Sequence, residues 1–361
     1  MVDKVLRIVV LPGDGIGVEV MDCALAVLDA ALGRVPGAAL DLVHMNAGAG
    51  TYLETGSALP DDVIAAIEGA DAVLLGAMGL PDVRYPDGTE IIPQIELRMI
   101  FGLYAGVRPI RLLPGAPTPL GDARANGMDF VIIRESTEGL FAHIAEGTVE
   151  DDAVAEDRLT ITRATSEKLF DFSFRLARQR KAAGHSGKLT LVDKANVFKS
   201  MAFFRKIFDE RARDFPDIAT DRQYVDAAAL NFVRNPWDYD VVVTENMFGD
   251  ILSDLGAGLI GGMGMAPSAD IGDTTAVFQP SHGTAPDIVG QGKANPTAMI
   301  GSLVLMFEWL AARDGGGPFG EAAALIDAAV CAAYADGKLI PFEAGGSDGT
   351  EAIMARVLGN M

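Results

Sequence analysis

The sequence predicts an α/β protein with a parallel sheet, because short apolar runs alternate with longer amphipathic segments. The runs at residues 6–11, 72–77 and 239–244 are typical of buried strands, whereas residues 18–32 and 166–183 show helical periodicity. Strands joined through helices favour parallel pairing, because a parallel connection needs a long crossover. Further helices are expected at residues 91–103, 297–313 and 320–334.

The length and composition predict one large or two medium-sized globular domains. The chain has 361 residues, 49% of them apolar, yet no apolar run is long enough to cross a bilayer. Its first residues lead directly into a strand without a secretory pattern. Cys23 and Cys331 lie in apolar, alanine-rich segments typical of reduced packing thiols. We therefore expect a cytoplasmic protein.

The formal net charge of −21 argues against nucleic acid and anionic membranes as partners. An anionic substrate would require basic residues gathered locally against this background. Arg98, Arg108 and Arg134 lie in apolar or extended contexts where a solvated position is a poor explanation. A structural ion pair would explain any one of them equally well. The three together favour a clamp for a substrate with several carboxylates.

Two carboxylates follow the strand at residues 239–244. Asp250 and Asp254 are four residues apart, so they project from one face of a helix, where their charges repel. A hard divalent cation such as Mg²⁺ or Mn²⁺ would remove that cost. The alternative is that both are ordinary helix N-terminal acids favoured by the helix dipole.

Two further polar residues end predicted strands. The segment at residues 189–196 contains Lys194, and the segment at residues 224–230 contains Asp226. A lysine at the end of a buried strand is unusual, and burial would lower its pKa toward use as a general base. Residues 142–160 are acidic and polar, and predict either an exposed arm or a solvated loop.

The first strand is followed by a glycine-rich turn at residues 12–17. A dinucleotide fingerprint that starts at Gly13 would need its third glycine at position 18, which is Val18. We therefore reject a Rossmann fold and expect a tight strand-to-helix turn near a cofactor.

These motifs, in this order, resemble those of the β-decarboxylating dehydrogenases. That family includes isopropylmalate, isocitrate, homoisocitrate, D-malate and tartrate dehydrogenases. The resemblance covers nearly the whole chain. Its motifs are residues 11–17, Arg98, residues 107–109, 134–135, 192–196, 224–228, 244–254 and 282–287.

The resemblance implies an isopropylmalate dehydrogenase-like α/β fold with two α/β domains around a central cleft. The first domain would combine residues 1–103 and 257–361 and bind the cofactor. The second, residues 104–256, would carry the dimer contacts, with an intersubunit arm at about 142–165. A homodimer would be the minimal active unit, because Lys194 and Asp226 would reach into the neighbouring subunit's cleft.

The resemblance also assigns roles to site residues. Lys194 and Asp226 would be catalytic, and Asp226, Asp250 and Asp254 would hold Mg²⁺ or Mn²⁺. The substrate, a small hydroxy-dicarboxylate or tricarboxylate, would contact Arg98, Arg108, Arg134, Glu90, Gln94 and Ile95. NAD would be bound by His282, Gly283, Thr284, Ala285, Pro286, Asp287, Ile288 and Asn295. Asp287 and Ile288 stand where NADP enzymes of the family place a lysine and a tyrosine.

Two departures from the family pattern bear on activity. Phe141 replaces the usual tyrosine proton donor, and a phenyl ring cannot donate a proton. His143, on the same face if the segment is extended, or a water would have to substitute. Gln94 and Ile95 match neither the leucines of isopropylmalate enzymes nor the serine and asparagine of isocitrate enzymes. We favour 3-isopropylmalate, oxidised to 2-oxoisocaproate. The alternatives are the family's other substrates, or a non-catalytic regulatory subunit.

Overall fold

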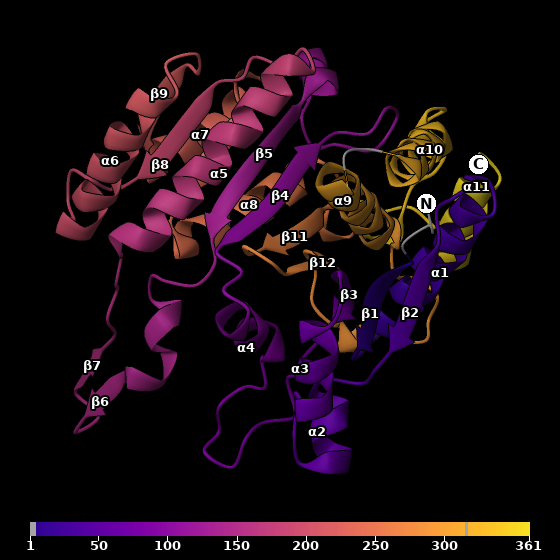
Figure 1. Ribbon diagram of the computed structural model, residues 1–361, viewed down its shortest axis with the longest axis horizontal. Helices are drawn as coiled ribbons and strands as arrows, with labels where there is room; N and C mark the ends of the chain where they lie inside the picture. Colours follow the sequence, from indigo (N-terminus) through magenta and orange to yellow (C-terminus); the bar gives the residue numbers. More distant parts are fainter. Residues whose placement is uncertain (1–4, 315–316) are drawn as a thin grey trace.

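The computed structural model describes residues 5–314 and 317–361. Residues 1–4, part of the segment predicted to lead directly into the first strand, lie outside the described residues. Ten of the described strands form one large sheet across the molecule, in the order β2-β1-β3-β12-β11-β4-β5-β10-β8-β9 (Figure 1). Their bounds are β1 Leu6–Gly13, β2 Leu40–His44, β3 Ala72–Ala77, β4 Ala105–Arg111, β5 Asp129–Glu135, β8 Leu189–Asp193, β9 Thr220–Tyr224, β10 Val241–Thr244, β11 Pro267–Ile271 and β12 Ala276–Pro280.

The sheet is mixed, so the prediction of a purely parallel sheet is wrong. β2, β1, β3 and β12 form one parallel group, and β5, β10, β8 and β9 form another. Between them, β11 and β4 are antiparallel to each neighbour. Residues 272–275, which join β11 to β12, are too few for a parallel crossover. The connection from β4 to β5, residues 112–128, holds three prolines and only the short 3₁₀ helix η1 (Ala123–Gly127).

The predicted helices are confirmed, with shifted ends. The helix expected at 91–103 is shorter, because Pro93 occupies its first turn and Gly102 follows with a positive φ of 57°. The helices are α1 Ile16–Leu32, α2 Ala49–Thr55, α3 Asp61–Glu68, α4 Pro93–Ile100, α5 Arg163–Ala182, α6 Lys199–Arg211, α7 Val225–Arg234, α8 Asn246–Leu259, α9 Thr297–Asp314, α10 Pro318–Tyr334 and α11 Thr350–Leu358.

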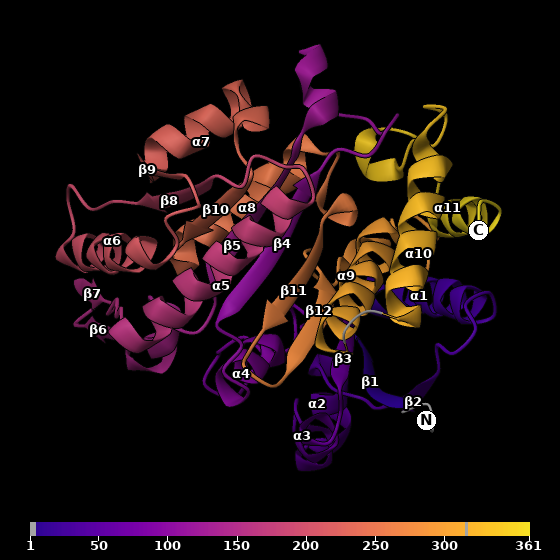
Figure 2. The same ribbon diagram turned by 45° about the horizontal axis from the view of Figure 1, so that its top comes forward.

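Helices pack on both faces of the sheet. α5 packs against β5, β8 and β10, and α8 against β4, β5 and β10. α9 covers β11 and β12 and lies beside α10, as both ribbon views show (Figures 1 and 2). Aromatic side chains of α5 and α6 pack in the core between them: the Phe208 ring lies edge-to-face with Phe170 and stacks on Phe174. Burying such side chains stabilises the fold by about 1.5–3 kcal/mol each.

The division into two domains stays a prediction. Its boundary between residues 256 and 257 falls within α8, which continues to Leu259. No helix in the described part of the chain is both long and apolar enough to span a bilayer. Both cysteines are free thiols, Cys23 being buried in α1.

A separate hairpin occupies part of the predicted arm. β6 (Thr148–Glu150) and β7 (Val154–Glu156) pair only with each other, and all their residues are exposed. Asp151 and Asp152 turn the chain with φ values of 50° and 52°. Figure 1 shows the hairpin extending away from the sheet. An isolated two-stranded hairpin is only marginally stable.

Candidate active site

Two hollows lie on opposite faces of the sheet at β4, whose side chains alternate between them. The first, which we call the clamp hollow, has a volume of about 160 Å³. Its charged lining residues are Arg98, Arg108, Arg134, Asp250 and Asp254. These are five of the residues that the sequence assigns to substrate and metal.

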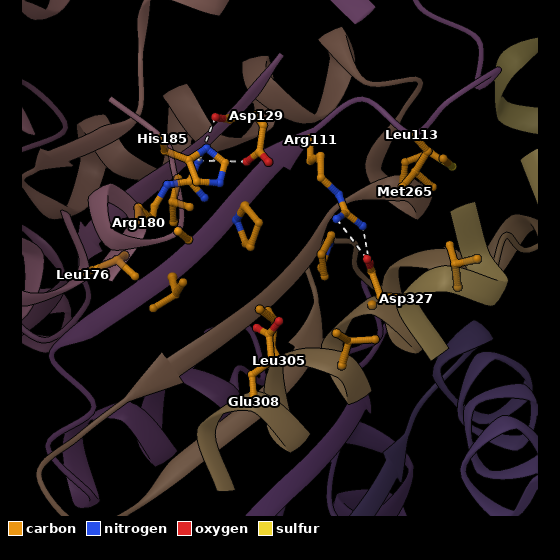
Figure 3. Close-up of a pocket in the computed structure, with 18 of the residues that line it drawn as sticks. Arg111, Leu113, Asp129, Leu176, Arg180, His185, Met265, Leu305, Glu308 and Asp327 are labelled. Atoms are coloured by element: carbon orange, nitrogen blue, oxygen red, sulfur yellow. Dashed lines mark hydrogen bonds and ion pairs between the residues drawn. The ribbon is translucent and has the colours of Figure 1, made fainter. Parts of the chain in front are cut away.

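The second hollow is larger, about 430 Å³, and lies between α5 and the pair α9 and α10 (Figure 3). It holds none of the predicted site residues, and β4 contributes Val107, Pro109 and Arg111 to it. Arg111 is paired there with Asp327 of α10. The clamp hollow is therefore the candidate site because of its charged lining residues, although the second hollow is larger.

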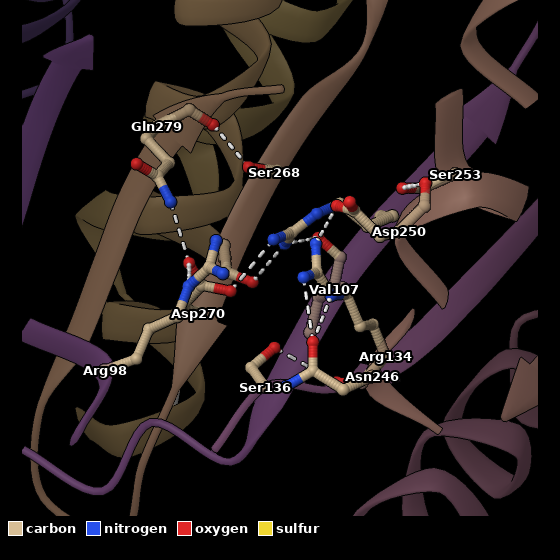
Figure 4. Close-up of polar contacts among 12 residues, drawn as sticks. Arg98, Val107, Arg134, Ser136, Asn246, Asp250, Ser253, Ser268, Asp270 and Gln279 are labelled. Carbon is tan, nitrogen blue, oxygen red and sulfur yellow. Dashed lines mark hydrogen bonds and ion pairs between the residues drawn. The ribbon is translucent and has the colours of Figure 1, made fainter. Parts of the chain in front are cut away.

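Three guanidinium groups converge on the clamp hollow from three elements. Arg98 comes from α4, Arg108 from β4 and Arg134 from β5, and each residue is more than 90% buried. Asp270 of β11, which the sequence analysis missed, accepts from Arg98 Nε at 3.0 Å and from Arg108 Nη2 at 2.9 Å (Figure 4). The sequence gives only a weak signal for it, a carboxylate between Ala269 and Ile271, although a buried charge needs a partner.

Arg134 is held by residues of α8. Its Nε and Nη2 donate to Asn246 Oδ1 at 3.0 and 2.8 Å, and its Nη1 contacts Asp250 (Figure 4). Burial lowers the pKa of Arg134 to about 10, and Arg98 adds to this against the opposing effect of Asp250. The cluster therefore gains from a further anion.

The two carboxylates of α8 lie beyond its first turn. α8 begins at Asn246, and Glu245 caps it by accepting hydrogen bonds from the amides of Met247 and Phe248. The alternative that Asp250 and Asp254 are helix N-terminal acids is therefore wrong. Burial, and then the charge of Asp250, raises the pKa of Asp254.

The carboxylates fit a hard divalent cation, because such a cation takes oxygen ligands and would remove their mutual repulsion. Within the described chain, no group of three His, Cys, Asp or Glu side chains is placed to hold a metal ion. One chain thus brings together two of the three predicted metal ligands, Asp250 and Asp254.

Lys194 and Asp226 lie outside the clamp hollow and contact each other. Lys194 follows β8 and Asp226 lies in the first turn of α7, whereas β10 and β5 separate β8 from β4. The hydrogen bond from Lys194 lowers the pKa of Asp226. The structure therefore groups these two residues but does not bring them to Asp250 and Asp254 of the same chain.

Phe141 and His143 begin the 3₁₀ helix η2 (Phe141–Glu146), so the extended segment assumed for them is wrong. The Phe141 ring is partly buried, and its centroid lies 5.2 Å from Cζ of Arg134. His143 instead contacts Thr160 Oγ1 at 2.8 Å and Glu146 Oε1 at 2.9 Å. It does not line the clamp hollow.

The three residues proposed to set substrate specificity lie in different environments. Gln94 lines the clamp hollow, and its Oε1 is buried without a hydrogen-bond partner in the described structure. Ile95 is partly buried beside it but is not a lining residue. Glu90 is exposed and pairs with Arg84 at 3.5 Å, so it lies outside the hollow.

The predicted cofactor loop is anchored to the glycine turn after β1. Thr284 Oγ1 donates to the Gly79 carbonyl at 2.7 Å, and the Thr284 carbonyl accepts from the Ile16 amide at 2.9 Å. A Cβ on Gly15 would lie 2.2 Å from that carbonyl oxygen, so the turn needs glycine there. Asp14, also missed, fixes the same turn by accepting hydrogen bonds from three backbone amides: those of Ala49, Gly50 and Gly79.

The polar side chains of this loop differ in whether they have hydrogen-bond partners. His282 Nε2 is buried without a hydrogen-bond partner in the described structure, and burial lowers the His282 pKa, which favours the neutral ring. Asp287 is exposed, and its side chain does not cap the short helix η6 (Pro286–Ile288). Asn295 is buried and bonds to Glu343 and to the Thr297 amide. The loop thus fits a ligand at His282, whereas the Asn295 side chain is already engaged.

The mixed sheet and its hollow of guanidinium and carboxylate groups define an α/β protein with a charged candidate ligand site. The family model for isocitrate/isopropylmalate dehydrogenase matches residues 7–352. The chain therefore belongs to this family, and it is an oxidoreductase of the β-decarboxylating dehydrogenase type.

Relatives and solved structures agree with this assignment. The chain is 42% identical over 305 residues to the 3-isopropylmalate/3-methylmalate dehydrogenase of Methanocaldococcus jannaschii, covering 84% of this chain and 86% of that one. It is 39% identical to the 3-isopropylmalate dehydrogenase of Methanothermobacter thermautotrophicus, covering 98% of both chains. The isocitrate dehydrogenase structure from Methylococcus capsulatus aligns with a TM-score of 0.85 and 35% identity, covering 98% of this chain and 99% of that one.

Proposed function

We propose that the protein catalyses the NAD⁺-dependent and divalent-metal-dependent oxidative decarboxylation of a 3-substituted malate, with 3-isopropylmalate as the leading substrate. The C2 hydroxyl would become a ketone, NAD⁺ would take the hydride, and the β-carboxylate would leave as CO₂. The observation that carries the proposal is the clamp hollow, where three guanidinium groups face two carboxylates.

The residues of this chain would bind and orient the substrate. Arg98, Arg108 and Arg134 would hold its carboxylates by charge-assisted hydrogen bonds. Mg²⁺ or Mn²⁺ held by Asp250 and Asp254 would supply Lewis acidity toward the C2 hydroxyl and the ketone. NAD⁺ on the 282–288 loop would supply the hydride acceptor.

The proton steps would fall to other residues. Lys194, through Asp226 or a water, would accept the hydroxyl proton. Phe141 cannot return a proton to the product carbon, and His143 is turned toward Thr160 and Glu146. A water is therefore our candidate donor.

We propose a homodimer with shared active sites. Leu230 and Val233 of α7 and Ile251 of the adjacent α8 are 55%, 50% and 61% exposed, and a second copy of the chain would bury these apolar side chains. Pairing through this face would let Lys194 and Asp226 serve the partner's hollow, which holds two metal ligands of its own. The β6–β7 hairpin would gain the partner it lacks.

The substrate proposal rests on two supports. Relatives at about 40% identity carry the names 3-isopropylmalate and 3-methylmalate dehydrogenase. Gln94 adds no charge to the hollow, which suits a neutral substituent. Isocitrate, homoisocitrate, D-malate and tartrate are the alternatives to test. The regulatory-subunit alternative is set aside, because the family and its named relatives define an enzyme.

The test is a panel of 3-isopropylmalate, 3-methylmalate, isocitrate, homoisocitrate, D-malate and tartrate assayed with NAD⁺ and Mn²⁺. We expect NADH formation to be fastest with a 3-alkylmalate, to stop with EDTA and to resume with added Mg²⁺ or Mn²⁺. Asp254→Asn is the matched variant, which should weaken metal binding and abolish turnover. Turnover by metal-free enzyme, or no turnover of any panel member, would refute the proposal.

A further inference from the structure

Asp270 occupies a central position behind the clamp hollow. In the sheet register it lies opposite Gly106 of β4, and Gly106 lies opposite Arg134 of β5. A Cβ on Gly106 would come within 2.6 Å of Ser136 Oγ and 3.1 Å of Asp270 Oδ1. The bare glycine thus leaves the space into which the Asp270 carboxylate fits, and Asp270 is 1% exposed.

Both carboxylate oxygens of Asp270 are engaged by the clamp. Oδ1 accepts from Arg108 Nη2 at 2.9 Å, and Oδ2 accepts from Arg98 Nε at 3.0 Å and Gln279 Nε2 at 2.7 Å. Burial opposes ionisation, but Arg108 and Arg98 outweigh it and lower the pKa of Asp270 to about 2. Asp270 is therefore an anion at every pH at which the protein would work.

The carboxylate changes the charge that the hollow offers to a ligand. Three guanidinium groups carry three positive charges, and Asp270 removes one of them. Asp250 and Asp254 would balance a divalent cation, and the pair of Lys194 and Asp226 adds no net charge. Among the described lining residues the three arginines are the only cationic side chains, because burial favours neutral His282.

We propose that Asp270 is a specificity-determining residue that restricts the clamp hollow to dianionic 3-substituted malates and disfavours tricarboxylates. This inference rests on the proposed function. A dianion meets two uncompensated positive charges, whereas the third carboxylate of a trianion would be brought into a buried site without its own cation. Asp270 acts through Arg98 and Arg108 and does not itself line the hollow.

The test compares kcat/KM for isocitrate, a trianion, with kcat/KM for 3-isopropylmalate or 3-methylmalate, both dianions. For the wild type we expect the dianion to be preferred by about a hundredfold or more. Asp270→Asn keeps the shape and removes the charge, so the ratio of trianion to dianion use should rise by about tenfold or more. Because only a ratio is predicted, a general loss of activity does not imitate the result.

Asp240→Asn is the matched control. Asp240 is also buried and paired with an arginine, Arg180, but it lies away from the clamp hollow, so the ratio should stay at the wild-type value. An active Asp270→Asn enzyme with an unchanged ratio would overturn the inference and leave the proposed function standing. Wild-type enzyme that uses isocitrate as well as 3-isopropylmalate would overturn it too, even if Asp270→Asn fails to fold.

A binding measurement tests the role of charge in the clamp hollow without requiring turnover. With Mg²⁺ present, calorimetry on wild-type protein should show tighter binding of glutarate, a dianion, than of tricarballylate, a trianion. Equal affinities would overturn the charge argument. Absence of turnover with every substrate would refute the proposed function alone if the dianion preference in binding remains.

Discussion

Arg98 is the clamp residue with the most hydrogen-bonding capacity left for a ligand. Its Nε bonds to Asp270, but its two terminal nitrogens have no hydrogen-bond partner in the described structure. Arg108 Nη1, in contrast, donates hydrogen bonds to the carbonyls of Val107 and Ala269. At the scale of single residues, Arg98 is therefore the sharpest probe of the clamp.

Arg98→Met should lower kcat/KM for the carboxylate substrate by about ten- to a hundredfold, the loss of a charge-assisted contact of roughly 1.5–3 kcal/mol. Arg108→Met and Arg134→Met should raise KM and lower kcat as well. Steady-state kinetics with the best malate of the panel measures this. Arg178→Met, which removes an exposed ion pair with Asp217, is the control and should leave the kinetics unchanged. Wild-type kinetics in all three clamp variants would refute the clamp.

Phe141 lies against Arg134, with its ring centroid 5.2 Å from Cζ of that lining residue. If the absence of a hydroxyl on this ring limits protonation of the product carbon, Phe141→Tyr should speed decarboxylation of the β-keto acid intermediate. Rapid-mix assays of wild type, Phe141→Tyr and His143→Ala measure this step. His143→Ala should have no effect, because His143 contacts Thr160 and Glu146 instead. An unchanged rate in Phe141→Tyr would show that a donor such as water already suffices.

The negative charge of Asp287 should make the enzyme prefer NAD⁺ to NADP⁺. It is exposed in the 282–288 loop and does not cap η6, so its carboxylate is available to the ribose hydroxyls of NAD⁺. It would repel the 2′-phosphate of NADP⁺. We expect NAD⁺ to be preferred by about a hundredfold in kcat/KM. Replacing Asp287 and Ile288 by Lys and Tyr should move the preference toward NADP⁺. Equal use of both cofactors by the wild type would contradict this.

At the scale of elements, the end of β5 carries a carboxyl group that links stability to pH. Burial raises the pKa of Glu135 to about 7, despite hydrogen bonds from the Thr137 amide and hydroxyl and the Glu138 amide. Since the ordinary pKa of a glutamate side chain is 4.5, the folded protein holds a proton between these pH values that the unfolded chain has lost. Stability should therefore fall as pH rises from 4.5 to 7.

Glu135→Gln removes this titration. Relative to wild type, the variant should gain up to about 3 kcal/mol in free energy of unfolding between pH 4.5 and 7. Urea unfolding at several pH values measures the difference. Glu54→Gln, an exposed carboxylate on α2, is the control and should follow the wild type. A constant difference between Glu135→Gln and wild type across this range would show that Glu135 ionises normally.

The elements also show what the sequence could and could not predict. Helical periodicity located α1, α5, α9 and α10 to within a few residues, because their amphipathic patterns are long. Strand direction was missed, because apolar runs do not encode it. The short 272–275 connection did encode it for β11 and β12, since it requires a hairpin.

The same limit applies to the site. The three arginines and the acids of α8 are recognisable because each is costly in its local context. Asp270 becomes meaningful only when β11 lies beside β4, a contact between residues 162 positions apart in the chain. The state of Gln94 and His282, whose buried atoms lack partners, also depends on tertiary contacts.

At the scale of the whole molecule, the proposed machinery is divided along the sheet, because β5 and β10 lie between β4 and β8. The clamp hollow lies over the central strands β4 and β11, whereas Lys194 and Asp226 lie toward the β9 end of the strand order. Next to them, α7 and α8 expose Leu230, Val233 and Ile251. A second copy docked on this face would complete both hollows at once, as two-fold symmetry requires.

Complementation between inactive subunits tests this arrangement. Lys194→Met and Asp254→Asn should each abolish activity as homodimers. In a mixed dimer, the hollow of the Lys194→Met subunit keeps Asp254 and receives a normal Lys194 from its partner, while the other hollow carries both changes. Unfolding and refolding an equal mixture should therefore restore about a quarter of wild-type activity, because half of the dimers are mixed and each has one intact site. Leu230→Asp, which should break the dimer, would abolish this recovery. If Lys194 served its own chain's hollow, every site in the mixture would carry one lesion and no activity would return.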